Sequence, residues 1–174
     1  MPSSSSMNAV CSEILSPESL NVSDELFDFV MKEKIVTNIT DDIEKPSINI
    51  YATSQLYLSS IIPILHDFGF KIIDEVAYKI VKNSENIYIN RFNLKLEDMK
   101  KLTDSKENIE TVISDSLNGK ILTRCRLFAL VYDEDLSIRK IMLLRAMVEY
   151  IDQSIISLNQ ATIFNTIPQY SKIS

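Results

Sequence analysis

The sequence predicts an α+β fold, in which a small sheet with helices is followed by a helical hairpin. The chain has 174 residues, of which 45% are hydrophobic and 24% charged, as in an ordinary globular protein with a sizeable core. Between residues 47 and 96, apolar and polar side chains alternate in short runs, as they do in β-strands. From Leu96 onward, apolar residues recur at the spacing of helices.

The first 46 residues predict a mostly flexible acidic leader with one short helix. Residues 1–45 contain nine acidic and three basic side chains, which accounts for the whole net charge of −6. Ser23 is a typical N-cap, and the acidic Asp24 and Glu25 that follow it favour the first turn of a helix. We expect that helix to continue to about Lys34 and a linker to occupy residues 37–46.

A strand and a helix are predicted next. Residues 48–51 alternate between apolar and polar side chains, which indicates a half-buried strand. The helix that follows contains Pro63, which is tolerated best in a first turn, so Ser59 or Ser60 is the expected N-cap. Gly69 is expected to end this helix, because glycine adopts the positive φ of a helix C-terminus without strain.

A β-hairpin is predicted from residues 71–81 and 87–94, joined by a polar turn at residues 83–86. In its first strand, one face is expected to carry Ile72, Val76, Tyr78 and Ile80. In its second strand the apolar pattern changes phase, so we expect a β-bulge near Asn90 and Arg91.

The rest of the chain is predicted to be helical. Asp104 and Glu107 have the spacing of a capping box, and Gly119 is expected to end the helix that they begin. The break between the next two helices is expected at the acidic run 133–135. Further helices are predicted over residues 121–132, 136–157 and 159–167.

The resulting order, β-α-β-β-α, makes up most of a ferredoxin-like βαββαβ unit. The closing strand is not evident, so it is either absent or supplied by a partner subunit or a neighbouring domain. We therefore divide the chain into the leader (1–46), a sheet-and-helix module (47–119) and a helical region (120–174).

The composition excludes several classes of site. The chain has two glycines, one histidine and two cysteines, so it has neither the glycine-rich loops that bind dinucleotides or phosphates nor a Cys/His zinc site. A dyad of Cys125 with His66 is one interpretation, but a buried structural thiol is favoured. No apolar run is long enough to span a membrane, and the acidic balance argues against nucleic-acid binding. We expect a cytoplasmic protein with no membrane or nucleic-acid partner.

Three groups of polar residues are candidate sites. Thr53, Ser54 and Gln55 join the first strand of the unit to its helix, where backbone N–H groups suit a small carboxylate, so they are the candidate effector site. The alternative, which is favoured, is a plain polar turn. Asp74 and Glu75 are expected on opposite faces of their strand, which argues against a catalytic carboxylate pair. A locally basic stretch fits either a DNA-reading helix-turn-helix or, as favoured, an ion-pair face; its members are Lys120, Arg124, Arg126, Arg139, Lys140 and Arg145.

Two blocks of the sequence resemble the long-chain bacterial NAD-dependent glutamate dehydrogenases. The first is an L-S-x-x-L-P-x-L-x-x-x-G-h-x-V-h-D-E pattern, with h apolar, matched by Leu58, Ser59, Pro63, Leu65, Gly69, Ile72, Asp74 and Glu75. An I-x-D-F-x-L strand follows it in the family and is matched by Ile89, Phe92 and Leu94. The second is a helical motif matched by Leu136, Ser137, Arg139, Leu143, Leu144, Arg145, Ala146, Tyr150 and Gln153. The chain departs from the family at Arg91, where an aspartate is usual, and at the helix break, where acidic residues and Ile138 replace a glycine and a tryptophan.

The resemblance implies an ACT-like module and a helical motif that lie upstream of a catalytic domain. That enzyme converts L-glutamate to 2-oxoglutarate and ammonia with NAD, but the residues that do so belong to the later domain. We therefore expect this chain to be inactive alone, to hold no cofactor, catalytic residue or metal, and to regulate or shape the enzyme. Its expected partners are the remaining domains or other subunits in a homo-oligomer, and a small amino acid as effector. The alternative is a stand-alone interaction or amino-acid-binding module that remained after a dehydrogenase gene was broken.

Overall fold

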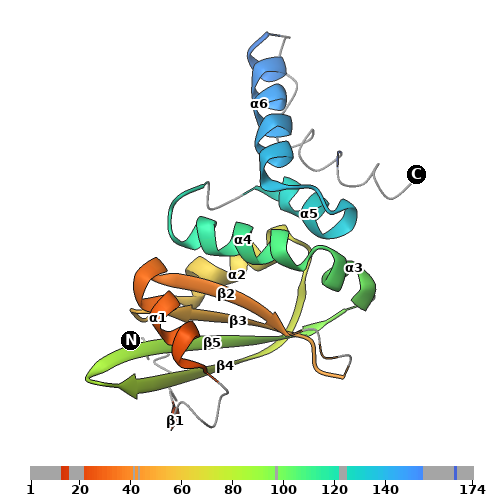
Figure 1. Ribbon diagram of the computed structural model, residues 1–174. Coiled ribbons are helices and arrows are strands. Elements are labelled where there is room, and N and C mark those ends of the chain that lie inside the picture. The colour runs from red at the N-terminus through yellow and green to blue at the C-terminus, as the bar shows by residue number, and fades with distance from the viewer. Residues whose placement is uncertain are drawn as a thin grey trace, which may run out of the picture.

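A five-stranded sheet lies at the centre of the computed structural model, which describes residues 13–15, 22–40, 42, 44–96, 98–121, 125–154 and 167. The strand order is β1-β4-β5-β3-β2; β1 is parallel to β4 and the other pairs are antiparallel. The α+β class is confirmed (Figure 1). The elements are β1 (Glu13–Leu15), α1 (Asp24–Glu33), β2 (Ile35–Thr40), β3 (Ser47–Ala52), α2 (Leu58–Asp67), β4 (Lys71–Lys82), β5 (Glu85–Lys95), α3 (Met99–Asp104), α4 (Lys106–Leu117), the 3-10 turn η2 (Arg126–Phe128), α5 (Ala129–Glu134) and α6 (Ile138–Ser154).

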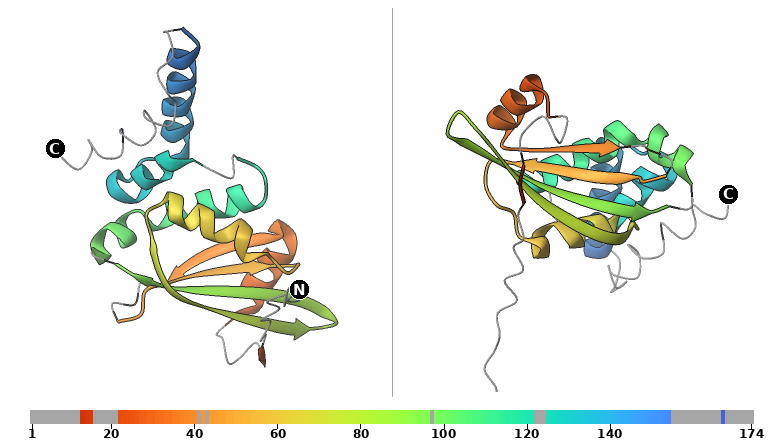
Figure 2. Two further views of the ribbon diagram at one scale, coloured as in Figure 1. Left: turned by 180° about the vertical axis from the view of Figure 1, so that it is seen from behind. Right: turned by 90° about the horizontal axis from the view of Figure 1, so that it is seen from below.

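Helices cover both faces of the sheet unequally. Helices α2 and α4 cover one face, and α1 lies against the other (Figures 1 and 2). The larger core lies on the α2 and α4 side and extends into η2, α5 and α6; it includes Ile48, Phe92, Ile61, Ile109, Phe128 and Ile141. The smaller core lies under α1 and includes Phe27, Val30, Tyr51 and Ile80. Helix α6 projects away from the sheet beyond α5 (Figure 1).

Several local predictions are confirmed. Ser23 caps α1, because its Oγ accepts a hydrogen bond from the Leu26 N–H at 3.2 Å. Gly69 has φ +85° directly after α2, as a helix-ending glycine should. The hairpin of β4 and β5 turns through Asn83 and Ser84, which both have positive φ, as in a two-residue type I′ turn.

The linker predicted over residues 37–46 is wrong in its first half. Strand β2 occupies Ile35–Thr40 and pairs antiparallel with β3. It takes the place beside β3 that the closing strand of a βαββαβ unit would fill, although it precedes the unit in the sequence. Because β2 also covers the outer edge of β3, β3 is buried at every position rather than half-buried. Its buried Asn49 is hydrogen-bonded to Thr40 Oγ1 at 3.0 Å and to Arg91 Nε at 2.8 Å.

Helix α2 begins earlier than predicted. Its N-cap is Tyr57 rather than Ser59 or Ser60, so Pro63 lies in the helix interior. Proline leaves the carbonyl of the residue four positions earlier without its helical donor. That residue is Ser59, which is exposed, so water can satisfy the carbonyl.

The β-bulge lies in β4, between Ile72 and Asp74, and not at Asn90 and Arg91 in β5. The extra residue changes the phase of β4. Ile72 is therefore opposite Leu94 and packs on the larger core, whereas Tyr78 and Ile80 belong to the smaller core on the other face. The prediction that Ile72 shares a face with them is wrong.

The helical boundaries also differ from those predicted. The side chain of Asp98 caps α3, and Ser105 is the N-cap of α4, so Asp104 and Glu107 form no capping box. Cys125 is extended, and in the described residues 126–132 the predicted helix over 121–132 is replaced by η2 and the first part of α5. The break at 133–135 is confirmed, because α5 ends at Glu134 and its C-cap Asp135 has φ 49°. The helix predicted over 159–167 lies outside the described residues apart from Ile167.

Candidate functional site

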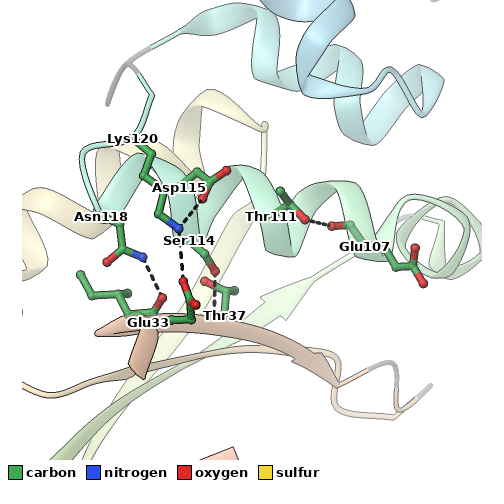
Figure 3. Close-up of polar contacts among 9 residues, drawn as sticks. Glu33, Thr37, Glu107, Thr111, Ser114, Asp115, Asn118 and Lys120 are labelled. Carbon is green, nitrogen blue, oxygen red and sulfur yellow. Dashed lines mark hydrogen bonds and ion pairs between the residues drawn. The ribbon is translucent and has the colours of Figure 1, made fainter. Parts of the chain in front are cut away.

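Side chains of α4 and of its C-cap residue Asn118 complete the outer edge of the sheet at β2. Ser114 Oγ accepts a hydrogen bond from the Thr37 N–H at 2.9 Å, and Glu110 Oε1 accepts one from the Ile39 N–H at 2.7 Å. Asn118 Nδ2 donates to the Ile35 carbonyl at 2.8 Å (Figure 3). We call these contacts the edge seam. They satisfy backbone groups that an edge strand would otherwise offer to another chain.

An ion-pair cluster lies at one end of the edge seam. Lys120 Nζ is 3.4 Å from Glu33 Oε2 and 3.4 Å from Asp115 Oδ1 (Figure 3). Hydrogen bonds to Glu33 and then to Asp115 raise the pKa of the exposed Lys120 above its usual value. The cluster joins the end of α1 to the segment after α4, in agreement with the predicted ion-pair role of Lys120.

A cavity of about 260 Å³ opens between α1, β2 and α4 beside this cluster. Thr37 is only 5% exposed, and its hydroxyl has no hydrogen-bond partner among the described residues. A buried hydroxyl without a hydrogen-bond partner is energetically costly. The polar lining residues include Glu33, Thr37, Glu110, Ser114, Asp115 and Lys120.

A second cavity, of about 400 Å³, lies where the sheet module meets the helical region. Its polar rim includes Lys71, Lys95 and Asp98, and Lys101 lies 3.8 Å from Asp133 across it. Its apolar floor contains Phe70, stacked on Phe68 and in edge contact with Tyr132.

A buried joint, formed by Asp67, Phe68, Cys125 and Phe128, connects α2 to η2. Asp67 Oδ2 accepts a hydrogen bond from the Cys125 N–H at 3.0 Å. The rings of Phe68 and Phe128 stack with centroids 5.4 Å apart, and both are fully buried. Burial raises the pKa of the Cys125 thiol, so the thiol stays neutral. Cys125 is buried, which supports its interpretation as a structural thiol. The side chain of His66, by contrast, is exposed.

The predicted effector residues lie in the connection between β3 and α2. The Thr53 N–H already donates to the Lys34 carbonyl at 3.0 Å, and Ser54 and Gln55 are exposed. Because α2 begins at Leu58, these residues precede the helix start instead of forming it. They line neither of the two cavities described above. Their role as an effector site stays a prediction.

The other sequence predictions can be placed as follows. Asp74 and Glu75 do lie on opposite faces, where they accept hydrogen bonds from Asn93 and Asn90 respectively. Arg145 pairs with Glu149 within α6 at 2.7 Å, and Arg124 lies outside the described residues. Among the described residues, no three His, Cys, Asp or Glu side chains are grouped to hold a metal ion. No described helix has both the length and the apolar surface to cross a membrane.

The edge seam was not foreseen from the sequence. Its residues are separated by more than seventy positions, and no local pattern joins Thr37 to Ser114. The sequence of α4 and its C-cap does contain a pattern that could have indicated the seam. Glu110, Ser114 and Asn118 recur at every fourth residue and so form one polar row along the helix.

Comparison with known proteins finds a similarity for two parts of the chain. Residues 36–107, from β2 to the start of α4, match the family described as the ACT3 domain of glutamate dehydrogenase. Residues 126–174, from η2 onward, match helical motif 3 of glutamate dehydrogenase. No curated protein matches the chain. The two matches come from one enzyme family, and each covers less than half of the chain: residues 36–107 are similar to an ACT3 domain of glutamate dehydrogenase, and residues 126–174 are similar to its helical motif 3.

Proposed function

We propose that this chain is a non-catalytic regulatory and structural portion of an NAD-dependent glutamate dehydrogenase of the long-chain bacterial kind. The parent enzyme would convert L-glutamate to 2-oxoglutarate and ammonia, with NAD bound to its catalytic domain. The two family matches support the dehydrogenase origin. The count of two glycines in the chain argues against a nicotinamide-binding loop within it.

The buried joint is the observation that carries this proposal. It places residues of the ACT3-type domain and of the helical region in one continuous core, to which Phe68, Phe128 and Ile141 all belong. A shared core resists sliding of its parts, because close-packed interiors transmit displacement instead of absorbing it. The chain would therefore act as one rigid piece between the catalytic domain and its neighbours.

Immunodepletion of an extract from the source cell tests the dehydrogenase assignment. An antibody raised against residues 96–153 should remove NADH formation that depends on L-glutamate, whereas preimmune serum should leave it. The purified chain should form no NADH from L-glutamate and NAD. Depletion of the antigen without loss of this activity would overturn the assignment and favour a stand-alone interaction module.

The regulatory part of the proposal is an amino-acid effector bound near Thr53, Ser54 and Gln55. Titration calorimetry of the chain with a panel of amino acids tests it. Heat that disappears in a Ser54→Ala, Gln55→Ala variant would support this site. Heat that is unchanged in the variant would remove the site, and no heat from any amino acid would remove the effector.

A further inference from the structure

We infer that β1 is a guard strand, which covers the part of the sheet edge through which two copies of this chain would otherwise pair. Strand β1 belongs to the acidic leader and lies on the outer edge of β4, opposite residues 78–80 (Figure 1). It is the edge strand at one end of the sheet, and β2 is the edge strand at the other. This role of β1 is independent of the dehydrogenase assignment.

The two ends of the sheet are protected differently. At β2, side chains of α4 and of Asn118 bind the strand backbone through the edge seam. At β4, the three residues of β1 are paired with a strand of twelve residues. An unpaired edge offers N–H and C=O groups to other chains, and proteins protect such edges with covering segments, charges or bulges. Among the described residues, the strand that covers β4 reaches only its second half.

The first half of β4 carries protection of its own. The β-bulge between Ile72 and Asp74 interrupts the regular ladder, and the adjacent Asp74 and Glu75 are charged. With β1 in place, the longest uncovered regular stretch is residues 74–77, which is shorter than a typical strand of about five or six residues. A second chain therefore has little regular backbone with which to pair.

Without β1, the uncovered regular edge would extend over residues 74–82. This stretch has exposed apolar side chains, because Val76 is 37% exposed and Val81 is 46% exposed. A regular edge with exposed apolar side chains is the kind of strand that pairs with another chain. The position that β1 occupies is therefore the one that keeps this pairing surface short.

The same stretch is complementary to itself, which points to a second copy as the partner. Glu75 and Lys79 lie on one face of β4, since they are opposite Phe92 and Tyr88 of β5. In an antiparallel pair centred on Ala77, Glu75 of each copy lies directly opposite Lys79 of the other. Opposite charges at such positions stabilise a pair of strands, and the symmetry provides the contact twice.

The other face of the pair is apolar. There Val76 of each copy lies opposite Tyr78 of the other, and contacts between aromatic and β-branched side chains also stabilise cross-strand pairs. Strand β1 already occupies the outer edge at residues 78–80, so it and a second copy of β4 exclude each other. Because β1 pairs through only three residues, we expect it to open more readily than the core of the sheet.

Sedimentation velocity of the full chain and of two shortened chains tests the guard role. Removal of residues 1–15 deletes β1, whereas removal of residues 1–12 keeps it and is the matched control. We expect the chain without residues 1–15 to form dimers with a dissociation constant at least about tenfold lower than that of the control. An excess of a peptide of residues 10–18 should dissociate these dimers. Equal association of the two shortened chains would overturn the inference.

The double variant Ile14→Pro, Leu15→Pro repeats the test in a chain of full length. Neighbouring N–H groups of a strand point to opposite sides, so one of the two prolines removes a donor to β4. Dimer formation should rise as in the shortened chain, whereas the control Ser4→Pro, Ser5→Pro should behave as the unaltered chain. Urea unfolding verifies that each variant is folded. A folded double variant that associates no more than its control would contradict the guard role.

The partner is tested in the chain without residues 1–15. Lys79→Glu places like charges opposite each other twice and should weaken the dimer by about tenfold, and addition of Glu75→Lys should restore it. Lys95→Glu makes the same change of charge on β5, away from this edge, and should leave the dimer unchanged. An unweakened dimer in Lys79→Glu, or no recovery in the double variant, would overturn the pairing of β4 with a second copy.

Discussion

Helix α4 meets the sheet through hydrogen bonds between its side chains and the backbone of β2, whereas η2 meets α2 through the stacked rings and single carboxylate of the buried joint. The edge seam is polar, carries an exposed ion pair and borders a cavity. The buried joint lies within the larger core. Because burial, and not the number of polar contacts, sets most of the stability, we expect the joint to hold the fold and the seam to remain adaptable.

The largest loss of stability is expected from Phe128→Ala in the buried joint. Removal of a fully buried ring leaves a cavity against Phe68 and should lower the free energy of unfolding by about 3–5 kcal/mol. Urea denaturation followed by circular dichroism measures the loss. The matched control is Phe29→Ala on α1, where the ring is 50% exposed and the expected loss is below about 0.5 kcal/mol. Similar losses for the two would contradict the difference between the regions.

Asp67→Ala should have the next largest effect, a loss of about 2–3 kcal/mol, because it leaves the buried Cys125 N–H without that acceptor. Asp67→Asn keeps an acceptor oxygen and should lose less. In a Cys11→Ser background, alkylation of the Cys125 thiol reports opening of the joint, and it should be faster in Asp67→Ala than in Asp67→Asn. Equal alkylation rates would show that the carboxylate does not close the joint.

Ser114→Ala tests how much a hydrogen bond of the edge seam contributes to stability. The Thr37 N–H loses its side-chain acceptor, so the expected loss is about 1 kcal/mol. Hydrogen exchange should localise the effect to the Thr37 amide. Thr111→Ala is the control on the same helix, because its hydroxyl donates to the Glu107 carbonyl within α4 and not to the sheet. An unprotected Thr37 amide in the unaltered chain would contradict the seam.

The smallest effect is expected from Lys120→Met, because the ion pair is exposed and screened by salt. Hydrogen bonds to Glu33 and then to Asp115 raise the pKa of Lys120 in the folded state. Its contribution is therefore fully present below the unfolded-state pKa and is lost as the pH rises through the folded-state pKa. Unfolding midpoints of the two chains, compared from neutral to strongly alkaline pH, should converge only at the alkaline end. Convergence already at neutral pH would show that the pair adds no stability.

Local patterns were sufficient where one residue fixes one backbone conformation. Ser23 before an acidic turn and Gly69 after α2 each act within a few residues, and each is found where the sequence predicts it. The turn predicted over residues 83–86 is present, but it is confined to Asn83 and Ser84. The apolar alternation likewise located β4 and β5. Such features depend on steric and capping preferences that are independent of the rest of the chain.

The sequence by itself determined the α+β class, the hairpin, the N-cap of α1, the glycine that follows α2 and the family to which its two regions are similar. Only the tertiary structure decided that β2 is a strand, that the bulge lies at Ile72 and Asp74, and that Thr37, Glu33 and Lys120 surround one cavity. The physical reason is that β2 is a short edge strand whose pairing with β3 and capping by α4 involve residues far apart in the chain. Local propensity cannot report an interaction whose partners meet only after folding.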